Sequence, residues 1–270
     1  MSNPTDDLAA AFDEHYFRHG CGEPYARSPA WLNLHNAYAD HIAREIQPTS
    51  VLDAGCAIGL LVEALRARNI EAWGIDISPY AIGQVTESVK PYCRVHSVTE
   101  PFGQRFDLIV CIEVLEHLPK AESEKAVTNL CAHTDDILFS SSPEDYAEAT
   151  HFNVQPPEYW AEHFARHGFY RDVDFDASFI TPWAARFRKQ SEPMQRVARN
   201  YERTFWRLQN ENAQLRQQAS RAHEALTHKS QLIAERNAAL AEMARLLDLV
   251  HRYEGGRFMR FMRWAKGLRK

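Results

Sequence analysis

Two glycines and two aspartates have the spacing expected of a loop that binds a nucleoside-containing ligand. Residues 51–59 read VLDAGCAIG. Gly55 would let the chain turn tightly with its backbone against a ligand, and Gly59 would let the next helix lie close to a sheet. Asp76 follows Asp53 by 23 residues and ends a second apolar run. An acid in this position can accept hydrogen bonds from both hydroxyl groups of a ribose.

Two histidines are candidates for moving a proton. His151 lies in a long polar stretch, residues 140–156, and His117 lies in the segment EHL at 116–118. The unperturbed pKa of histidine, ~6.5, suits a general base that removes a proton from a reacting hydroxyl. We take His151 as the first candidate and His117 as the second. The alternatives are that His151 orders its own loop and that His117 packs against a helix.

Strands and helices alternate through the first 190 residues, so these candidates fall where strands end. The pattern predicts strands at 50–54, 71–75, 92–98, 106–112, 137–140, 171–175 and 179–187, with helices at 28–45, 59–68, 79–89, 121–132 and 157–167. Such alternation is typical of a parallel sheet that is covered on both faces and binds ligands at the carboxyl ends of its strands. The last two strands have no helix between them, which favours a closing antiparallel hairpin.

Three motifs identify a family resemblance. The segments VLDAGCAIG (51–59), GIDIS (74–78) and FDLIVCIEVLEHLP (106–119) resemble class I S-adenosylmethionine-dependent methyltransferases, in the usual order and at the usual separations. The resemblance covers residues 51–189. It implies an α/β fold with a Rossmann-like, seven-stranded, mostly parallel sheet whose last strand is antiparallel. It also implies S-adenosylmethionine as the cofactor.

The resemblance assigns roles to residues around the cofactor. It implies that the loop holding the methionine end contains Asp53, Gly55, Cys56, Ala57 and Gly59. Asp76 would hold the ribose, Ile77 would flank the adenine, and Ser97 and Val98 would close over the base. Relatives often have an acid at this position, and residues 97–99 of this chain, Ser-Val-Thr, contain none. Glu113 would lie under the sulfonium, and Tyr16 and Tyr25 would belong to an N-terminal lid over the cofactor.

The acceptor side is less defined. Residues 150–169 and 178–187 resemble bacterial methyltransferases associated with glycosyltransferases and surface-polysaccharide synthesis, which implies in-line transfer of a methyl group to a sugar hydroxyl. The aromatic side chains Tyr146, Tyr159, Trp160 and Trp183 would then stack on a sugar, or else belong to the core. Two alternatives remain open: a small aromatic or quinone-like acceptor, and a catalytically silent coiled-coil scaffold. The sequence assigns no residue to a metal.

The chain continues into an uninterrupted helical segment. No proline or glycine occurs between 194 and 254. With Asn212 at heptad position a, fourteen of seventeen a and d positions are apolar. This repeat predicts a long C-terminal coiled-coil helix. The a and d residues would form an apolar stripe along the helix that one domain cannot cover. We therefore expect a homo-oligomer, with a different coiled-coil partner as the alternative.

The final segment has the opposite charge from the rest. The chain carries a net charge of −5. Residues 251–270 contain seven Lys or Arg and one Glu, which is +6, so the remaining 250 residues carry −11. Apolar residues 258, 261, 262, 264, 265 and 268 share one helical face opposite basic residues, which predicts an amphipathic helix on an anionic membrane surface. Docking on a protein is the alternative, and the acidic body disfavours nucleic acid.

The overall composition predicts a soluble protein. Hydrophobic residues make up 45% of the chain, and no run approaches the ~20 apolar residues of a membrane span. The first residues lack a signal-peptide pattern, and the five cysteines form no CxxC pair, which argues against both a zinc site and a disulfide framework. We expect a cytoplasmic protein, with peripheral contact at the inner membrane face. Its predicted segments are a lid at 1–48, a methyltransferase domain at 49–190, a coiled coil at 193–254 and a tail at 257–270.

Overall fold

The computed structural model describes residues 9–21, 23–190 and 193–267. The chain divides into two compact units, Met1–Tyr201 and Glu202–Lys270. The first unit contains the sheet and the candidate site residues. The second contains most of the long helix and the tail.

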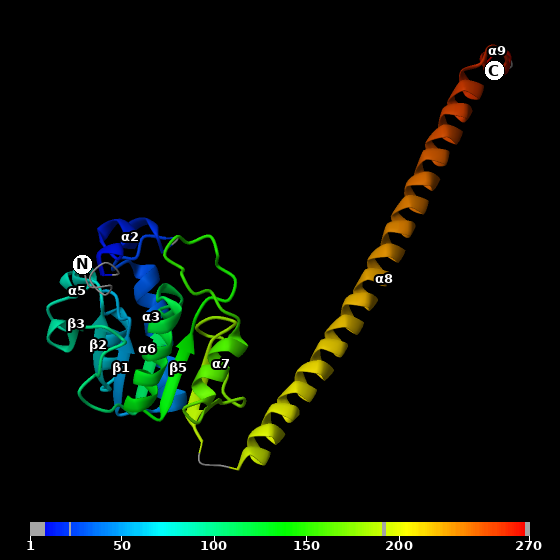
Figure 1. The fold of residues 1–270 in the computed structure, drawn as a ribbon. Helices are drawn as coiled ribbons and strands as arrows, with labels where there is room; N and C mark the ends of the chain where they lie inside the picture. Colours follow the sequence, from blue (N-terminus) through cyan, green and yellow to red (C-terminus); the bar gives the residue numbers. More distant parts are fainter. Residues whose placement is uncertain (1–8, 22, 191–192, 268–270) are drawn as a thin grey trace. The chain divides into compact units, whose positions relative to one another are not determined.

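The first unit is built on a seven-stranded sheet (Figure 1). The strands are β1 (Ser50–Ala54), β2 (Glu71–Asp76), β3 (Cys93–Val95), β4 (Leu108–Ile112), β5 (Asp136–Ser140), β6 (Phe169–Arg171) and β7 (Ala185–Lys189). Their order is β3-β2-β1-β4-β5-β7-β6. Neighbours from β3 to β5 are parallel, whereas β7 pairs antiparallel with both β5 and β6. This arrangement confirms the predicted methyltransferase-type sheet.

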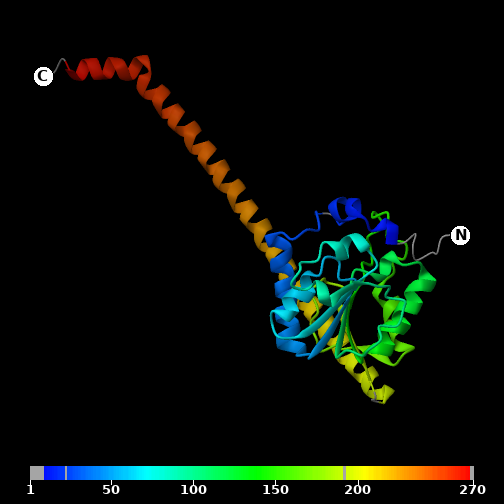
Figure 2. The same ribbon diagram turned by 90° about the vertical axis from the view of Figure 1, so that its left-hand side faces the viewer.

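Alternate residues of the central strands supply two separate hydrophobic cores. In β4, Ile109 and Cys111 join the core beneath α6 (Lys120–His133) and α7 (Pro157–Ala165), whereas Leu108 and Val110 join the opposite core. The second core is covered by α3 (Pro29–His41) and α4 (Leu60–Arg66). Figure 2 shows the sheet between these helices. A strand that is apolar at every position is therefore buried on both faces, as parallel strands usually are.

Short elements complete the unit, some at the carboxyl ends of the strands and some in the segments that lead into β1 and β3. They are α2 (Glu14–His19), the π-helical turn η1 (Ile42–Ile46), α5 (Pro79–Gly83), and the 3-10 turns η2 (Lys90–Tyr92) and η3 (Leu115–His117). In Figure 1, α2 and the green loop after β5 lie over the same end of the sheet. The candidate site lies beneath them.

The predicted bounds of the last two strands were wrong. The pattern placed them at 171–175 and 179–187, but the strands are β6 (Phe169–Arg171) and β7 (Ala185–Lys189). The intervening chain forms turns, in which the Asp176 carboxylate accepts the Ser178 N–H at 2.9 Å. Phe175 and Phe179 pack against the second core from these turns. Apolar residues in a well-packed loop thus resembled a strand.

The helix predicted at 79–89 is also shorter than expected. Only α5 (Pro79–Gly83) is α-helical, and the chain then continues through turns to η2. Val85 and Val89 are nevertheless buried. Gly83 and the β-branched residues that follow it are poor helix formers, so the core is filled without regular helix. The strand predicted at 92–98 is likewise confined to β3, because Ser97 Oγ accepts the Thr99 N–H at 3.2 Å in a local turn.

The second unit consists of helix. The helix α8 (Met194–Gly255) spans 62 residues, and α9 (Arg257–Gly267) follows it. This confirms the predicted long C-terminal helix. Large apolar residues at the a and d positions of α8 are exposed. They include Phe205, Leu208, Leu215, Leu226, Ile233, Leu240, Met243, Leu247 and Val250. Over the described residues, no helix is both long and apolar enough to span a membrane.

Candidate active site

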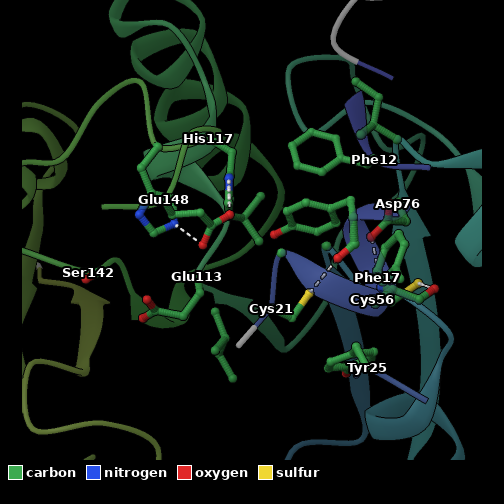
Figure 3. A pocket seen from close by; sticks show the side chains of 18 of the residues that line it. Phe12, Phe17, Cys21, Tyr25, Cys56, Asp76, Glu113, His117, Ser142 and Glu148 are labelled. Carbon is green, nitrogen blue, oxygen red and sulfur yellow. Dashed lines mark hydrogen bonds and ion pairs between the residues drawn. The ribbon is translucent and has the colours of Figure 1, made fainter. Parts of the chain in front are cut away.

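A single large cavity joins most of the predicted site residues. It has a volume of about 1010 Å³ and lies at the carboxyl ends of the central strands, beneath the N-terminal segment (Figure 3). The predicted residues that line it are Tyr16, Tyr25, Asp53, Gly55, Cys56, Ala57, Asp76, Ile77, Ser97, Val98, Glu113, His117 and His151. Gly59 does not line it. Ligands of open α/β sheets bind at this end, so the cavity is the candidate active site.

The loop after β1 depends on its two glycines. Gly55 and Gly59 have φ values of +94° and +75°, in the left-handed region that glycine tolerates best. A Cβ added to Gly55 would collide with the side chain of Val114, and one added to Gly59 would lie 3.2 Å from the Cys93 sulfur. Gly55 therefore shapes the cavity floor. Gly59 is the N-cap of α4 and lets this helix begin close against the sheet.

Asp53 and Asp76 are two nearly buried acids on the cofactor side. Burial and the neighbouring Asp76 carboxyl raise the pKa of Asp53 to about 8. Burial also raises the pKa of Asp76, although backbone hydrogen bonds oppose this shift. Asp76 accepts the N–H groups of Ala57 and Ser78, each at 2.8 Å. These bonds hold the Asp76 carboxyl at the rim of the glycine loop.

The charge of the cavity lining suits a cationic ligand. Five acids line it, which are Asp53, Asp76, Glu113, Asp145 and Glu148. Among the described residues, no Lys or Arg lines it. S-adenosylmethionine carries a sulfonium and an ammonium, so an acidic cavity beside a glycine loop fits this cofactor. A dinucleotide pyrophosphate would instead be repelled.

The N-terminal segment forms one wall of the cavity. Phe12, Tyr16, Phe17 and Tyr25 all line it, and the Tyr25 hydroxyl is 2.9 Å from His35 Nε2. Figure 3 shows Phe12, Phe17 and Tyr25 on the side of the cavity opposite Ser142 and Glu148. The sequence predicted Tyr16 and Tyr25 here but missed Phe12 and Phe17. The sequence signal that could have identified them is the recurrence of aromatic residues at positions 12, 16 and 17, on the same segment as Tyr16.

Glu113 stands at the turn that leaves β4. Its φ of +52° is unusual for a residue with a side chain. The Glu113 Oε1 atom accepts the Trp183 Nε1–H at 3.0 Å, which joins β4 to the loop before β7. Trp183 lines the cavity, whereas Tyr146 is exposed and Trp160 is buried in the core. Of the four aromatic residues considered for stacking on an acceptor, only Trp183 lines this cavity.

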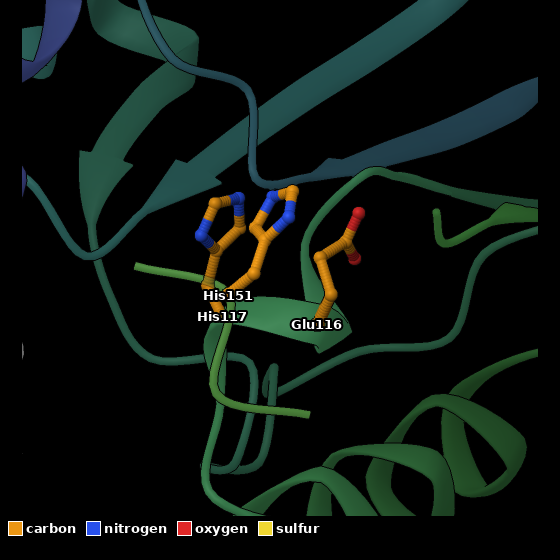
Figure 4. A group of neighbouring side chains, drawn as sticks. All are labelled: Glu116, His117 and His151. Carbon is orange, nitrogen blue, oxygen red and sulfur yellow. The ribbon is translucent and has the colours of Figure 1, made fainter. Parts of the chain in front are cut away.

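The two candidate histidines lie side by side. The ring centroids of His117 and His151 are 4.6 Å apart. Burial, with a further contribution from His151, lowers the pKa of His117 to about 4, so this ring is uncharged at neutral pH. The His151 Nε2 atom is 3.1 Å from a Glu148 carboxylate oxygen, and its Nδ1 atom is 2.8 Å from the Asp145 carbonyl oxygen. Of the two rings, His151 is therefore the one with a carboxylate beside its Nε2 atom, and the uncharged His117 ring packs against it (Figure 4).

Sequence reasoning missed the acids that surround these histidines. Asp145, Glu148 and Ser142 belong to the same loop as His151, and all three line the cavity. The presence of acids within six residues of His151 was the available signal. Arg27, two residues after Tyr25, pairs with Glu63 at 2.7 Å and does not line the cavity. Two groups have ligand atoms close enough for a metal ion: Glu116, His117 and His151, and Asp145, Glu148 and His151.

Known proteins share this sequence pattern and fold. Residues 30–173 match the family described as "Methyltransferase domain". The chain is 33% identical over 120 residues to a ubiquinone biosynthesis O-methyltransferase of Azoarcus sp. (strain BH72), covering 40% of this chain and 50% of that protein. A protein of the same name from Methylococcus capsulatus is 30% identical over 145 residues, covering 48% and 56%. The chain thus spans about half the length of these curated relatives.

Two solved structures share the fold at low identity. The magnesium protoporphyrin IX methyltransferase of Synechocystis, with bound S-adenosylmethionine, has a TM-score of 0.52 at 16% identity, covering 70% of this chain and all of that one. A 1,6-didemethyltoxoflavin-N1-methyltransferase of Burkholderia thailandensis has a TM-score of 0.50 at 17% identity, covering 71% and 92%. The family match extends over half of the sequence and includes β1, β2, β4 and the glycine loop. The chain belongs to the family described as "Methyltransferase domain", and its fold is that of class I S-adenosylmethionine-dependent methyltransferases.

Proposed function

We propose that this methyltransferase methylates a phenolic hydroxyl of an aromatic, quinone-like acceptor. The observation that carries the proposal is the composition of the cavity: aromatic rings form its wall, and histidines and carboxylates gather at one end. An aromatic acceptor can pack edge-on or stacked against such rings. The names of the curated relatives support the same class of acceptor. They favour it over the sugar hydroxyl that residues 150–169 and 178–187 suggested.

The chain's residues divide between the two reactants. Asp53 and the glycine loop face the methionine end of the cofactor, and Asp76 faces its ribose. Bound S-adenosylmethionine supplies a methyl group that an acceptor oxygen attacks in line with the carbon–sulfur bond, which breaks as the oxygen–carbon bond forms. Trp183 and Glu113 are joined by a hydrogen bond, and both line the cavity. Holding both reactants in one cavity aligns the acceptor oxygen with the methyl carbon, which lowers the barrier to transfer.

His151 is the proposed general base. The acceptor hydroxyl loses its proton to His151, and the Glu148 carboxylate stabilises the resulting imidazolium from 3.1 Å. The uncharged His117 ring packs against His151 and does not compete for the positive charge. This assignment keeps the first candidate of the sequence. It adds Glu148 as the positioning residue.

A radiolabel assay tests the acceptor class. The full chain is incubated with methyl-labelled S-adenosylmethionine and, separately, with a catechol, a phenol carrying an apolar chain, and a set of glycans. We expect label on the phenolic oxygen, and loss of turnover in His151→Ala with unchanged cofactor affinity. His167→Ala is the matched control, because His167 contacts Thr128 outside the cavity. Label found only on glycans would refute the proposed acceptor and restore the sugar alternative.

We also propose that two or more copies associate along α8. The exposed apolar a and d residues of this helix would be covered by a second copy in heptad register. Sedimentation of the full chain tests this. Leu226→Asp combined with Leu240→Asp should give monomers, whereas Thr227→Asp with Ala241→Asp, at neighbouring outward positions, should not. A monomeric parent protein would contradict the proposal.

The basic helix α9 is a proposed membrane contact. Phe258, Phe261 and Trp264 are exposed, and basic residues alternate with them. Vesicles of phosphatidylglycerol and phosphatidylcholine test this by cosedimentation. We expect binding that is lost after deletion of 257–270 and after Phe258→Ser with Phe261→Ser. If the double serine variant binds as well as the parent, charge alone explains the attraction.

A further inference from the structure

One face of α3 holds the N-terminal segment against the cofactor side of the cavity. Trp31 and His35 are four residues apart on this helix and therefore share a face. The Trp31 Nε1–H donates to the Pro24 carbonyl oxygen at 2.9 Å, and the ring centroids of Trp31 and Tyr25 are 4.5 Å apart. The Tyr25 N–H donates to the Phe17 carbonyl oxygen at 2.7 Å. These contacts fix the Tyr25 ring in the cavity wall.

His35 has a defined hydrogen-bonding role in this arrangement. Its Nδ1 atom lies 2.9 Å from the Trp31 carbonyl oxygen. A carbonyl oxygen can only accept, so the hydrogen-bond network assigns a proton to Nδ1. Burial lowers the pKa of His35, so the ring is uncharged at neutral pH and its Nε2 atom carries no proton. Nε2 is therefore an acceptor, and it lies 2.9 Å from the Tyr25 hydroxyl.

The Tyr25 hydroxyl donates its one proton to His35. Burial raises the pKa of Tyr25 well above its usual value, with a further contribution from the Asp53 carboxyl, so the hydroxyl stays protonated. With this proton engaged by Nε2, only the lone pairs of the oxygen are available to a ligand. Toward the cavity, Tyr25 can then accept a hydrogen bond but cannot donate one. His35 thus determines which ligand groups Tyr25 can recognise.

The surroundings of Tyr25 favour a positively charged ligand group. Tyr25, Asp53 and Asp76 all line the cavity, whose described lining residues include no Lys or Arg. Figure 3 shows Tyr25 on the same side of the cavity as Cys56 and Asp76. The methionine end of S-adenosylmethionine carries an ammonium, which only donates hydrogen bonds, and a carboxylate, which only accepts them. An oxygen that only accepts suits the ammonium and not the carboxylate.

We propose that Tyr25 accepts a hydrogen bond from the cofactor ammonium beside Asp53, and that His35 is the positioning residue that commits Tyr25 to this role. The proposal concerns the cofactor, so it does not depend on the acceptor class proposed above. S-adenosylmethionine and S-adenosylhomocysteine carry the same ammonium. The contact should therefore strengthen the binding of both without favouring the transition state.

The helix predicted at 28–45 already placed Trp31 and His35 on one face. His35 was not a candidate, because a histidine on a helix has no feature in the sequence that separates it from other surface histidines. Its role depends on Tyr25, which is ten residues earlier and reaches His35 only through the turn after α2.

Calorimetry with three ligands tests the role of Tyr25. The ligands are S-adenosylhomocysteine, an analogue without its amino group and an analogue without its carboxylate. A hydrogen bond to a charged group predicts that Tyr25→Phe binds S-adenosylhomocysteine about tenfold more weakly or worse than the parent does. We expect a similar loss for the analogue without the carboxylate. The analogue without the amino group should bind the parent and Tyr25→Phe equally.

Two substitutions of His35 test the positioning role. His35→Leu removes the acceptor and should weaken binding of S-adenosylhomocysteine by about fivefold or more, because the Tyr25 proton is then left without its partner. His35→Gln keeps an acceptor near the place of Nε2 and should stay within about twofold of the parent. His41→Leu is the matched control, because His41 lies on the same helix, stacks on Phe179 and does not line the cavity. It should bind all three ligands as the parent does.

Nitrogen-15 NMR of the free parent protein provides a measurement that needs no variant. We expect the His35 proton on Nδ1 at neutral pH. A proton on Nε2 would overturn the proposal, because Tyr25 could not then donate to this atom. Equal loss of affinity in Tyr25→Phe for ligands with and without the amino group would also overturn it, once circular dichroism shows that the variant is folded. Neither result depends on methylation of a phenol, so each differs from a failure of the proposed function.

Discussion

Replacing Asp76 with Asn should weaken cofactor binding in a way that can be calculated from the structure. The variant keeps the shape of the side chain and removes its charge. Hydrogen bonds to a charged group contribute about 1.5–3 kcal/mol each, and the amide retains one neutral acceptor. We therefore expect a loss of about 2–3 kcal/mol, which is roughly a 30- to 150-fold increase in Kd.

Asp107→Asn is the matched control for this prediction. Asp107 also accepts two backbone N–H groups, those of Thr49 at 2.9 Å and Ser50 at 3.0 Å. It precedes β4, at the amino end of the sheet, and does not line the cavity. Both variants should lower the free energy of unfolding, but only Asp76→Asn should lose affinity.

Isothermal titration with S-adenosylhomocysteine provides the assay. It measures affinity without turnover, so the acceptor does not need to be known. A Kd for Asp76→Asn within about threefold of the parent value, which is under ~0.7 kcal/mol, would refute the assignment of Asp76 to the ribose. So would an equal loss in Asp107→Asn.

Three further predictions concern the cofactor loop and the acceptor side. Because the pKa of Asp53 is about 8, cofactor affinity should rise with pH up to that value. The free energy of unfolding of the free protein should instead fall between pH ~4 and 8, because the folded protein holds the proton of Asp53 more tightly than the unfolded chain does. Asp53→Asn should flatten both pH profiles. Gly55→Ala should cost at least ~2 kcal/mol of stability and weaken cofactor binding in calorimetry. Gly103→Ala is the control, because Gly103 has a φ of +83° but open space around it. This variant should cost about 1 kcal/mol of stability and leave cofactor affinity unchanged. Trp183→Phe removes the hydrogen bond to Glu113 and should lower kcat in the methyl-transfer assay while cofactor Kd stays constant.

The sheet was predictable because its strands carry local signals. Runs such as residues 108–112 are apolar throughout, and both faces of β4 are buried. The two final strands were misplaced for the opposite reason, since Phe175 and Phe179 are apolar residues packed from a turn. The pattern of apolar residues in the sequence identifies side chains that are buried. It does not show whether the backbone between them is hydrogen-bonded to a neighbouring strand.

The same distinction applies to the candidate site. The glycine loop and Asp76 were predictable, because one continuous segment after each strand supplies them. Glu148 was not assigned to the site, although it lies three residues from His151. Trp183 was named only as a candidate stacking residue, because its contact with Glu113 joins segments 70 residues apart. The contact of Glu116 with the Ser142 N–H has no sequence signature, since it depends on how η3 packs against the loop after β5.

The most direct test of the account is a product analysis with deuterated methyl groups. The full chain is mixed with methyl-deuterated S-adenosylmethionine and a catechol, and mass spectrometry follows both products. We predict one S-adenosylhomocysteine for each deuterated methyl ether on the phenolic oxygen, with formation of both reduced in parallel in Asp76→Asn. A protein that binds the cofactor in calorimetry but forms neither product with any phenolic acceptor would contradict the proposed function.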